Sequence, residues 1–209
     1  MFPFFDIGNR YAHLYLNGSV KNISHKELFE NYSDRKIYYI NVKHSIKSDL
    51  KKRKLWVDLE PFVNIKGTYK GMGIDRKVLL LSRGNGIYID AGSAITIDMY
   101  CDGEYQGGTI LPGIWSIKKS YAQISPLLEI ESLSSVNLSV LPNSSTQETL
   151  SYGIIAPIVA LIQKINSDNL PIYCCGGDGE LLAHYLEFAE YDNKLVFQGM
   201  YKVMKECKC

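Results

Sequence analysis

Two stretches of the chain share one pattern: residues 2–18, FPFFDIGNRYAHLYLNG, and residues 86–103, GIYIDAGSAITIDMYCDG. In each stretch an apolar run ends in an Asp-x-Gly turn, which begins at Asp6 in the first copy and at Asp90 in the second. A strand-like segment follows each turn and closes on a hairpin signal, Asn17-Gly18 or Asp102-Gly103. The repeat predicts two copies of one structural unit that face each other.

The chemistry of the two turns suits a nucleotide. A glycine in a tight turn lets backbone N–H groups approach phosphate oxygens closely. A carboxylate beside that glycine can hold a hydrated cation, which neutralises phosphate charge. Taken alone, Asp6 could be a turn residue that only closes a strand, but the second copy at Asp90 favours the phosphate interpretation.

The segments that flank the turns define the fold class. Each half begins with three expected antiparallel strands, at residues 2–7, 11–16 and 19–23 in the first half and 87–90, 94–100 and 104–111 in the second. Further helices and strands are expected at 74–83, 146–166, 178–190 (helices) and 195–197 (a strand). This order resembles the ribonuclease-H-like unit of the actin and sugar kinase superfamily. It predicts an α/β protein of two actin-like ATPase units, residues 1–83 and 84–209, with mixed sheets flanked by helices.

Composition narrows the class of protein. The 209 residues are 46% hydrophobic, enough for a buried core, and the net charge of +1 does not favour a nucleic-acid or membrane partner. Five cysteines are not spaced like a secreted disulfide framework, and the first residues lack the basic start of a signal peptide. No run of 18 apolar residues is present, so no membrane span is expected. These features predict a cytoplasmic protein.

Five motifs occur along the chain in a specific order: DIGN at 6–9, GIDR at 73–76, DAGSAITID at 90–98, GGTILPGI at 107–114 and CGGDG at 175–179. Together they make the chain similar to type III pantothenate kinases over nearly its whole length. Each motif alone is common in proteins, and the order and spacing of all five carry the resemblance.

The resemblance implies a binding site for ATP with Mg²⁺. It assigns the ATP phosphates to the first turn, formed by Asp6, Ile7, Gly8, Asn9 and Arg10, with Asp6 near Mg²⁺ through a water molecule. The family usually has Thr or Ser where this chain has Arg10, so the arginine could replace that hydroxyl with a charged fork or point away. It also implies that Asp90 binds a monovalent cation, K⁺ or NH₄⁺, and that Ser93 contacts ATP.

The resemblance assigns substrate to the GIDR motif and two outlying residues. Asp75 is implied as the general base, and pantothenate is implied to contact Gly73, Ile74, Asp75, Arg76, Tyr69 and Thr146. Thr146 would reach the substrate from the neighbouring subunit of a homodimer. Without the resemblance, Asp75 and Arg76 would be read as an ordinary ion pair at a helix start, and Asp98 is expected to be a strand residue outside the site.

The implied function is ATP-dependent phosphorylation of pantothenate to 4'-phosphopantothenate, the first step of coenzyme A biosynthesis. Two alternatives stay open: a phosphotransferase of the same fold with another substrate, and a non-catalytic regulatory relative. The apolar helix expected from Thr146 onward favours either a dimer interface or a buried core helix; its apolar residues are Ile154, Ile155, Ile158, Val159, Leu161 and Ile162.

Overall fold

The computed structural model describes residues 2–207 and contains two five-stranded sheets flanked by helices, which confirms the expected α/β class. Its contacts divide the chain into two compact units. The first unit comprises the chain up to residue 85, residues 98–107 and the chain from residue 192, and the second comprises residues 86–97 and 108–191. The expected boundary after residue 83 lies near the first junction, but compact units and repeated units need not coincide, so that boundary stays a prediction.

The sheet of the first unit has the strand order β3-β2-β1-β4-β5. Its strands are β1 (Phe4–Ile7), β2 (Ala12–Leu16), β3 (Ser19–Ile23), β4 (Ile37–Asn41) and β5 (Trp56–Asp58). β1, β2 and β3 are antiparallel neighbours, and β4 and β5 add in parallel register on the other side of β1. Asn17 and Gly18 both have positive φ angles, 51° and 82°, as the hairpin signal requires.

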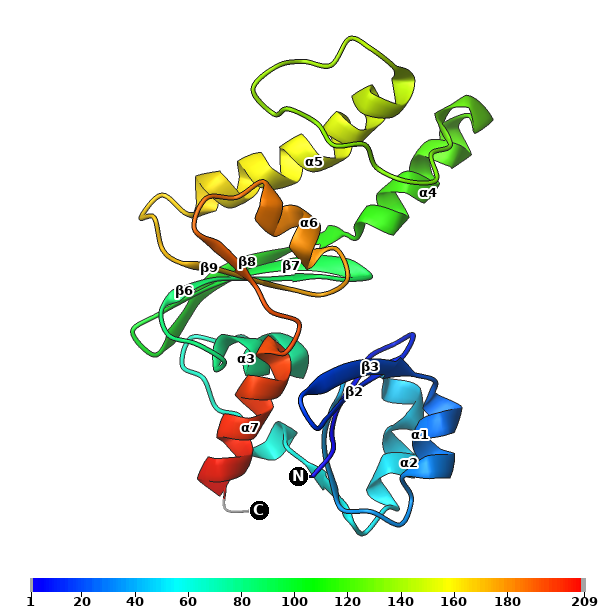
Figure 1. Ribbon diagram of the computed structural model, residues 1–209. Coiled ribbons are helices and arrows are strands. Elements are labelled where there is room, and N and C mark those ends of the chain that lie inside the picture. Colours follow the sequence, from blue (N-terminus) through cyan, green and yellow to red (C-terminus); the bar gives the residue numbers. More distant parts are fainter. Residues whose placement is uncertain (1, 208–209) are drawn as a thin grey trace. The chain divides into compact units, whose positions relative to one another are not determined.

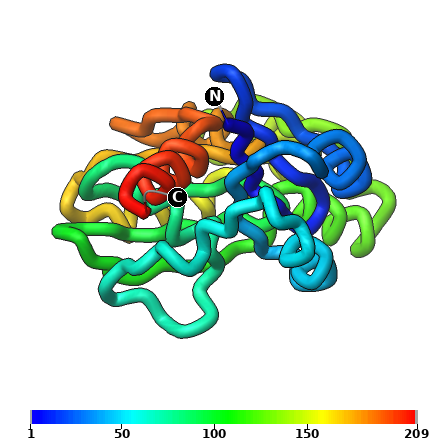
Figure 2. The backbone as a smooth tube through the Cα atoms, turned by 90° about the horizontal axis from the view of Figure 1, so that it is seen from below, coloured from blue at the N-terminus to red at the C-terminus, as the bar shows by residue number. Residues whose placement is uncertain are grey.

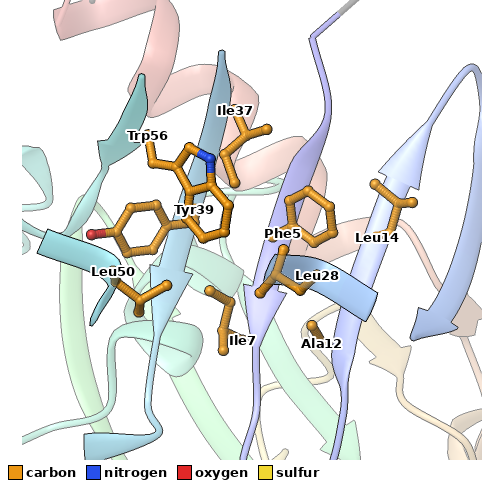
Figure 3. Close-up of a cluster of buried hydrophobic side chains, with 9 residues drawn as sticks. All are labelled: Phe5, Ile7, Ala12, Leu14, Leu28, Ile37, Tyr39, Leu50 and Trp56. Carbon is orange, nitrogen blue, oxygen red and sulfur yellow. The ribbon is translucent and has the colours of Figure 1, made fainter. Parts of the chain in front are cut away.

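Helices α1 (His25–Asn31) and α2 (Lys47–Lys51) cover one face of this sheet (Figures 1 and 2). Ser24 and Glu27 form the capping box that starts α1, each accepting a backbone N–H of the other. Figure 3 shows the core between the helices and the sheet, which consists of Phe5, Ile7, Ala12, Leu14, Leu28, Ile37, Tyr39, Leu50 and Trp56. Burial of these side chains holds β1, and therefore the turn that follows it, in place.

Helices α3 (Ile74–Leu80) and α7 (Leu195–Cys207) pack against each other and against the sheet of the first unit. The Phe197 ring stacks on Tyr15 of β2, and α7 approaches α3 so closely that a Cβ on Gly199 would lie 2.0 Å from the Val78 carbonyl oxygen. The strand expected at 195–197 is wrong, because this apolar run begins α7. A short buried run does not distinguish a strand from one turn of a buried helix.

The second sheet has the order β10-β9-β6-β7-β8. Its strands are β6 (Gly86–Ala91), β7 (Ala94–Cys101), β8 (Glu104–Pro112), β9 (Ile172–Cys175) and β10 (Ala189–Tyr191). Its helices are α4 (Ile114–Ile124), α5 (Thr146–Ile165) and α6 (Gly179–His184), with α5 and α6 on the same face of the sheet (Figure 1). The helix expected at 178–190 ends at His184, and the edge strand β10 follows. Short 3₁₀ helices lie at His44–Ile46, Glu60–Phe62 and Pro126–Leu128.

Helix α5 is a core helix of the second unit. Most of its apolar side chains are buried within that unit, including Ile154, Ile155, Ile158, Val159 and Ile162. Of the two readings of this apolar helix, burial supports the core helix, because the unit itself covers these side chains. By length and hydropathy α5 is the one helix among residues 2–207 that could cross a membrane, a test that core helices also pass.

Candidate active site

The GIDR motif forms the start of α3, with Gly73 as the N-cap residue. Asp75 occupies the first turn, and its Oδ1 accepts a hydrogen bond of 2.8 Å from the backbone N–H of Arg76. A Cβ on Gly73 would lie 2.4 Å from that same Oδ1. Gly73 therefore leaves the space in which the carboxylate rests, while Ile74 is buried and anchors the helix start.

Arg76 lies in a buried network with one acid and two tyrosines. Its Nε and Nη2 donate to the two carboxylate oxygens of Asp98, at 2.9 and 2.5 Å. Nη1 donates to the Tyr69 hydroxyl at 2.8 Å, and Nη2 also lies 3.3 Å from the Tyr105 hydroxyl. Arg76 is 6% exposed and Asp98 is fully buried, so this is a bidentate ion pair shielded from water rather than a surface pair.

The loop before α3 brings Tyr69 to Arg76. The backbone N–H of Tyr105, on β8, donates to the Lys66 carbonyl at 2.9 Å. Gly67 has φ +84° and lies against the Tyr105 carbonyl group, so that an added Cβ would be 2.4 Å from the Tyr105 carbonyl oxygen. The Tyr69 side chain is 51% exposed while its hydroxyl accepts from Arg76, so it links the buried network to the surface.

Burial and neighbouring charges have opposite effects on the pKa values of Asp75 and Arg76, and both pKa values end up raised. Burial raises the pKa of Asp75, and the backbone N–H and the charge of Arg76 oppose that rise. The hydrogen bonds to Asp98 raise the pKa of Arg76, which keeps the guanidinium charged. Burial also raises the pKa of Tyr105, so that its hydroxyl stays protonated. A carboxylate of raised pKa beside a permanently charged arginine suits proton transfer from a hydroxyl group.

The first Asp-x-Gly turn joins β1 to β2 in the same unit. The Gly8 N–H donates to the Tyr11 carbonyl at 3.0 Å and closes the turn. His25 Nε2 lies 2.9 Å from the Gly8 carbonyl oxygen, and Lys43 Nζ donates to the Asn9 carbonyl at 2.9 Å. Two side chains thus hold the turn at its carbonyls. Ile7 is buried and Asp6 is partly buried, whereas Asn9 and Arg10 are exposed.

The second turn lies in the second unit, at the end of β6. The Asp90 carboxylate rests against Gly176, which has φ +83° and whose added Cβ would lie 2.5 Å from Asp90 Oδ1. The Ala91 carbonyl accepts a hydrogen bond of 2.9 Å from the backbone N–H of Asp178. The CGGDG loop, residues 175–179, is therefore hydrogen-bonded to this turn. Ser93 is exposed and follows it, and its carbonyl accepts from the N-cap glycine of α4, Gly113, at 3.2 Å.

The donors at the two turns fit cations. One carboxylate with neighbouring backbone carbonyls, as at Asp90, is a hard oxygen donor set of the kind that suits an alkali ion. Asp6, at the end of β1, offers a carboxylate for a hydrated Mg²⁺. Among residues 2–207 no group of three or more His, Cys, Asp or Glu side chains forms a metal site of its own.

Thr146 is the first residue of α5 and is exposed. It lines a surface pocket together with Leu127, Ile130 and Gln147, all of the second unit. The structure thus groups Gly73, Asp75, Arg76 and Tyr69 within the first unit. It places Asp90, Ser93 and Thr146 in the second.

Asp98 and Tyr105 are the residues that the sequence reasoning missed. Asp98 was expected to lie outside the site, yet it supplies the main partner of Arg76. One signal was available: a charged residue ends the apolar stretch Ala94-Ile95-Thr96-Ile97, and a buried acid requires a buried cation. Nothing in the sequence pairs Asp98 with Arg76 in particular.

Solved structures identify the class of fold. An AMPPNP-bound MreB 5 of Spiroplasma citri has a TM-score of 0.53 at 12% identity, covering 100% of this chain and 97% of that one. A Sinorhizobium meliloti protein assigned as a 2-dehydro-3-deoxygalactonokinase has a TM-score of 0.57 at 11% identity, covering 99% and 96%. The fold is that of the actin-like ATPases and sugar kinases, which confirms the expected fold class.

The family follows from closer relatives. The type III pantothenate kinase profile matches residues 38–168. Type III pantothenate kinases of Campylobacter jejuni strain RM1221 and of Wolinella succinogenes are 41% and 40% identical, covering 96% and 97% of this chain and 95% and 96% of theirs. The chain belongs to the type III pantothenate kinase family, as its motifs indicated. A crystal structure from Campylobacter jejuni, assigned to the Baf family of transcriptional activators, has a TM-score of 0.87 at 38% identity over 99% and 98% of the chains.

Proposed function

We propose that this protein transfers the γ-phosphoryl group of ATP to the primary hydroxyl of pantothenate, giving 4'-phosphopantothenate. Family membership and the kinase fold support this function. The observation that carries it is the start of α3, where Asp75 has a raised pKa beside a charged and firmly held Arg76. Phosphoryl transfer needs positioning and charge neutralisation more than covalent help from the protein, and this arrangement offers both.

In this proposal Asp75 accepts the proton of the attacking hydroxyl. Arg76 and Tyr69 face the substrate through the side of the network that reaches the surface, with Gly73 and Ile74 shaping the pocket. Asp6, Ile7, Gly8, Asn9 and Arg10 bind the ATP phosphates, and Ser93 contacts ATP. Mg²⁺ held near Asp6 and a monovalent cation at Asp90 neutralise phosphate charge when bound.

Release of ADP tests this proposal against its alternatives. The purified protein should release ADP from ATP when pantothenate is present and release almost none without it. ADP release that needs a different alcohol points to a phosphotransferase with another substrate. No release with any alcohol, despite bound ATP, points to the regulatory relative, and binding of DNA would then be measured next.

We propose a cytoplasmic enzyme without a nucleic-acid or membrane partner, consistent with its net charge of +1.

Replacing Asp90 with Ala should remove the dependence on a monovalent cation. Wild-type activity is expected to need Mg²⁺ and to be higher in K⁺ or NH₄⁺ than in Na⁺, because the larger ions give up their hydration water more easily. In Asp90→Ala the rates in K⁺ and Na⁺ should become equal and low. A variant that keeps the wild-type preference for K⁺ would place the cation elsewhere. Asp102→Asn, on the β7–β8 hairpin turn, is a control that should leave the preference unchanged.

We propose further that the active protein is a homodimer that uses the face formed by α4 and the adjoining 3₁₀ helix. α4 has a single buried residue, Ile114, although its sequence is amphipathic. Ile124 is 73% exposed and Leu127 is 88% exposed, with Trp115 and Ile130 nearby. Thr146 borders this face through the pocket it shares with Leu127 and Ile130. An apolar face of this kind commonly marks an interface, and its position would bring Thr146 toward the neighbouring subunit.

Charge introduced on this face should separate the subunits. Leu127→Glu is expected to give a monomer in sedimentation and to lose most of its activity, because each site would lack the partner's Thr146. Leu55→Glu, at an exposed position of the first unit, is the matched control and should remain dimeric and active.

Mixing two inactive variants tests the shared site itself. Asp75→Asn and Thr146→Arg should each have little activity alone and regain part of it together, since one site of each mixed dimer has both wild-type groups. No rescue despite proven subunit exchange would contradict the shared site.

A further inference from the structure

Asp75 and Arg76 are adjacent in the chain and opposite in charge, yet their side chains do not pair. Asp75 Oδ1 accepts a hydrogen bond from the backbone N–H of Arg76, while the Arg76 guanidinium extends to Asp98. Neighbouring residues on a helix point in different directions, but an arginine side chain is long enough to bend back to a neighbouring carboxylate. The partner that prevents this is Asp98, on the central part of β7.

We propose that Asp98 is a positioning residue, which holds the Arg76 guanidinium away from the base Asp75 and fixes its remaining edge toward the substrate. This inference rests on the proposed function. Asp98 touches neither the reacting atoms nor the nucleotide in this proposal and acts only through Arg76.

The hydrogen bonds around the guanidinium support this role. Arg76 has five N–H donors, and its bonds to Asp98, Tyr69 and Tyr105 occupy four of them. Nε and both hydrogens of Nη2 face the interior, so one hydrogen of Nη1, beside the half-exposed Tyr69, is left for a substrate oxygen. The fork is fixed by three partners on different segments, which is the condition for presenting one N–H in a defined direction.

The charges support the same role. The ion pair of Arg76 is with Asp98, so Asp75 is not stabilised as a carboxylate by a direct side-chain ion pair. The charged groups around Asp75 are Arg76 and Asp98, with the hydroxyls of Tyr69 and Tyr105 bound to the same guanidinium. A buried ion pair contributes little net stability compared with apolar residues of equal size, so stability alone does not account for Asp98.

Asp98→Asn is the direct test, because it keeps the shape and removes the charge. The amide cannot accept from both guanidinium nitrogens, so Arg76 should turn toward Asp75 and stabilise its carboxylate form. The acid limb of the pH profile of kcat/KM should therefore move to lower pH, and kcat should fall about tenfold to a hundredfold, as for a misplaced catalytic group. Asp102→Asn, further along the same hairpin, should change neither quantity.

An acid limb that stays at the wild-type pH in a folded Asp98→Asn protein would overturn the proposal, because an Arg76 that turns toward Asp75 must lower the pKa of that carboxyl group. If this variant does not fold, the double variant Arg76→Gln with Asp98→Asn tests the proposal instead, because it leaves no charge in the buried network. Its activity should equal that of Arg76→Gln alone, as expected for a residue that acts only through Arg76. A further multiplicative loss in the pair would show an independent role and contradict the proposal.

A crystal structure separates this inference from the proposed function. If the wild-type protein does not phosphorylate pantothenate, the proposed function fails. The position of Arg76 in the folded Asp98→Asn variant still tests whether Asp98 positions Arg76. A guanidinium that moves to Asp75 supports the positioning role, and one that stays in its wild-type place refutes it.

Discussion

Asp75→Asn is expected to fold normally and to lower kcat by about 10²–10⁴-fold, the usual cost of removing a general base. The amide keeps the shape of the carboxylate and its bond to the Arg76 backbone N–H but cannot accept a proton from the hydroxyl of the substrate. Steady-state kinetics with saturating ATP and pantothenate would measure the loss. Asp58→Asn is a matched control, because burial also raises the pKa of Asp58 in the first unit, away from α3. Near wild-type kcat in Asp75→Asn would remove Asp75 from the mechanism.

The same variant should not lose stability. The pKa of Asp75 is raised in the folded protein, so ionisation disfavours the folded state, and the group contributes most to stability at pH values below its unfolded pKa. That contribution is lost as the pH rises through the folded pKa. At pH 7 the free energy of unfolding of Asp75→Asn should therefore equal or exceed that of the wild type, with the difference shrinking toward about pH 4. Denaturant titrations at the two pH values measure it, and a large destabilisation at pH 7 would contradict the raised pKa.

Gly73→Ala is expected to lower kcat/KM by about 10²-fold, because its new methyl group would displace the Asp75 carboxylate. The backbone at Gly73, with φ −55° and ψ 139°, is accessible to alanine, so the free energy of unfolding should change by no more than about 1 kcal/mol. The substitution therefore moves the base and leaves the fold intact.

Gly84→Ala is the control for that experiment, since a Cβ there meets no atom within 4 Å. It should be fully active. A Gly73→Ala protein with wild-type kcat/KM would show that the Asp75 carboxylate need not occupy its present position.

The sequence predicts the parts of the fold that depend on neighbouring residues. The strands around Asp6 and Asp90 follow from apolar runs, Asp-x-Gly turns and hairpin dipeptides, and the structure has each of these strands within a few residues of its expected bounds. The start of α1 at Ser24 follows from a four-residue capping pattern. Local hydrogen bonding and local backbone preferences determine these features, so the sequence contains them directly.

Features that depend on distant contacts were not predictable. Asp98 pairs with Arg76 across 22 positions of the chain, and no local rule joins them. The apolar side chains of α5 could equally have covered a partner, and only the packing shows that they are internal. The run at 195–197 belongs to α7 because Gly199 allows contact with α3, which is a tertiary effect. The site residues taken from the family resemblance were named by motif, and their chemical roles remain predictions.

The central claim is that pantothenate is the substrate that receives the phosphoryl group. Its most direct test is one reaction vessel containing the purified protein, ATP, Mg²⁺ and K⁺ with pantothenate and a panel of other small alcohols at equal concentration, analysed by mass spectrometry. We expect 4'-phosphopantothenate to accumulate with ADP while the other alcohols stay unmodified. Phosphorylation of another alcohol in preference to pantothenate, or no phosphorylated product at all, would contradict it.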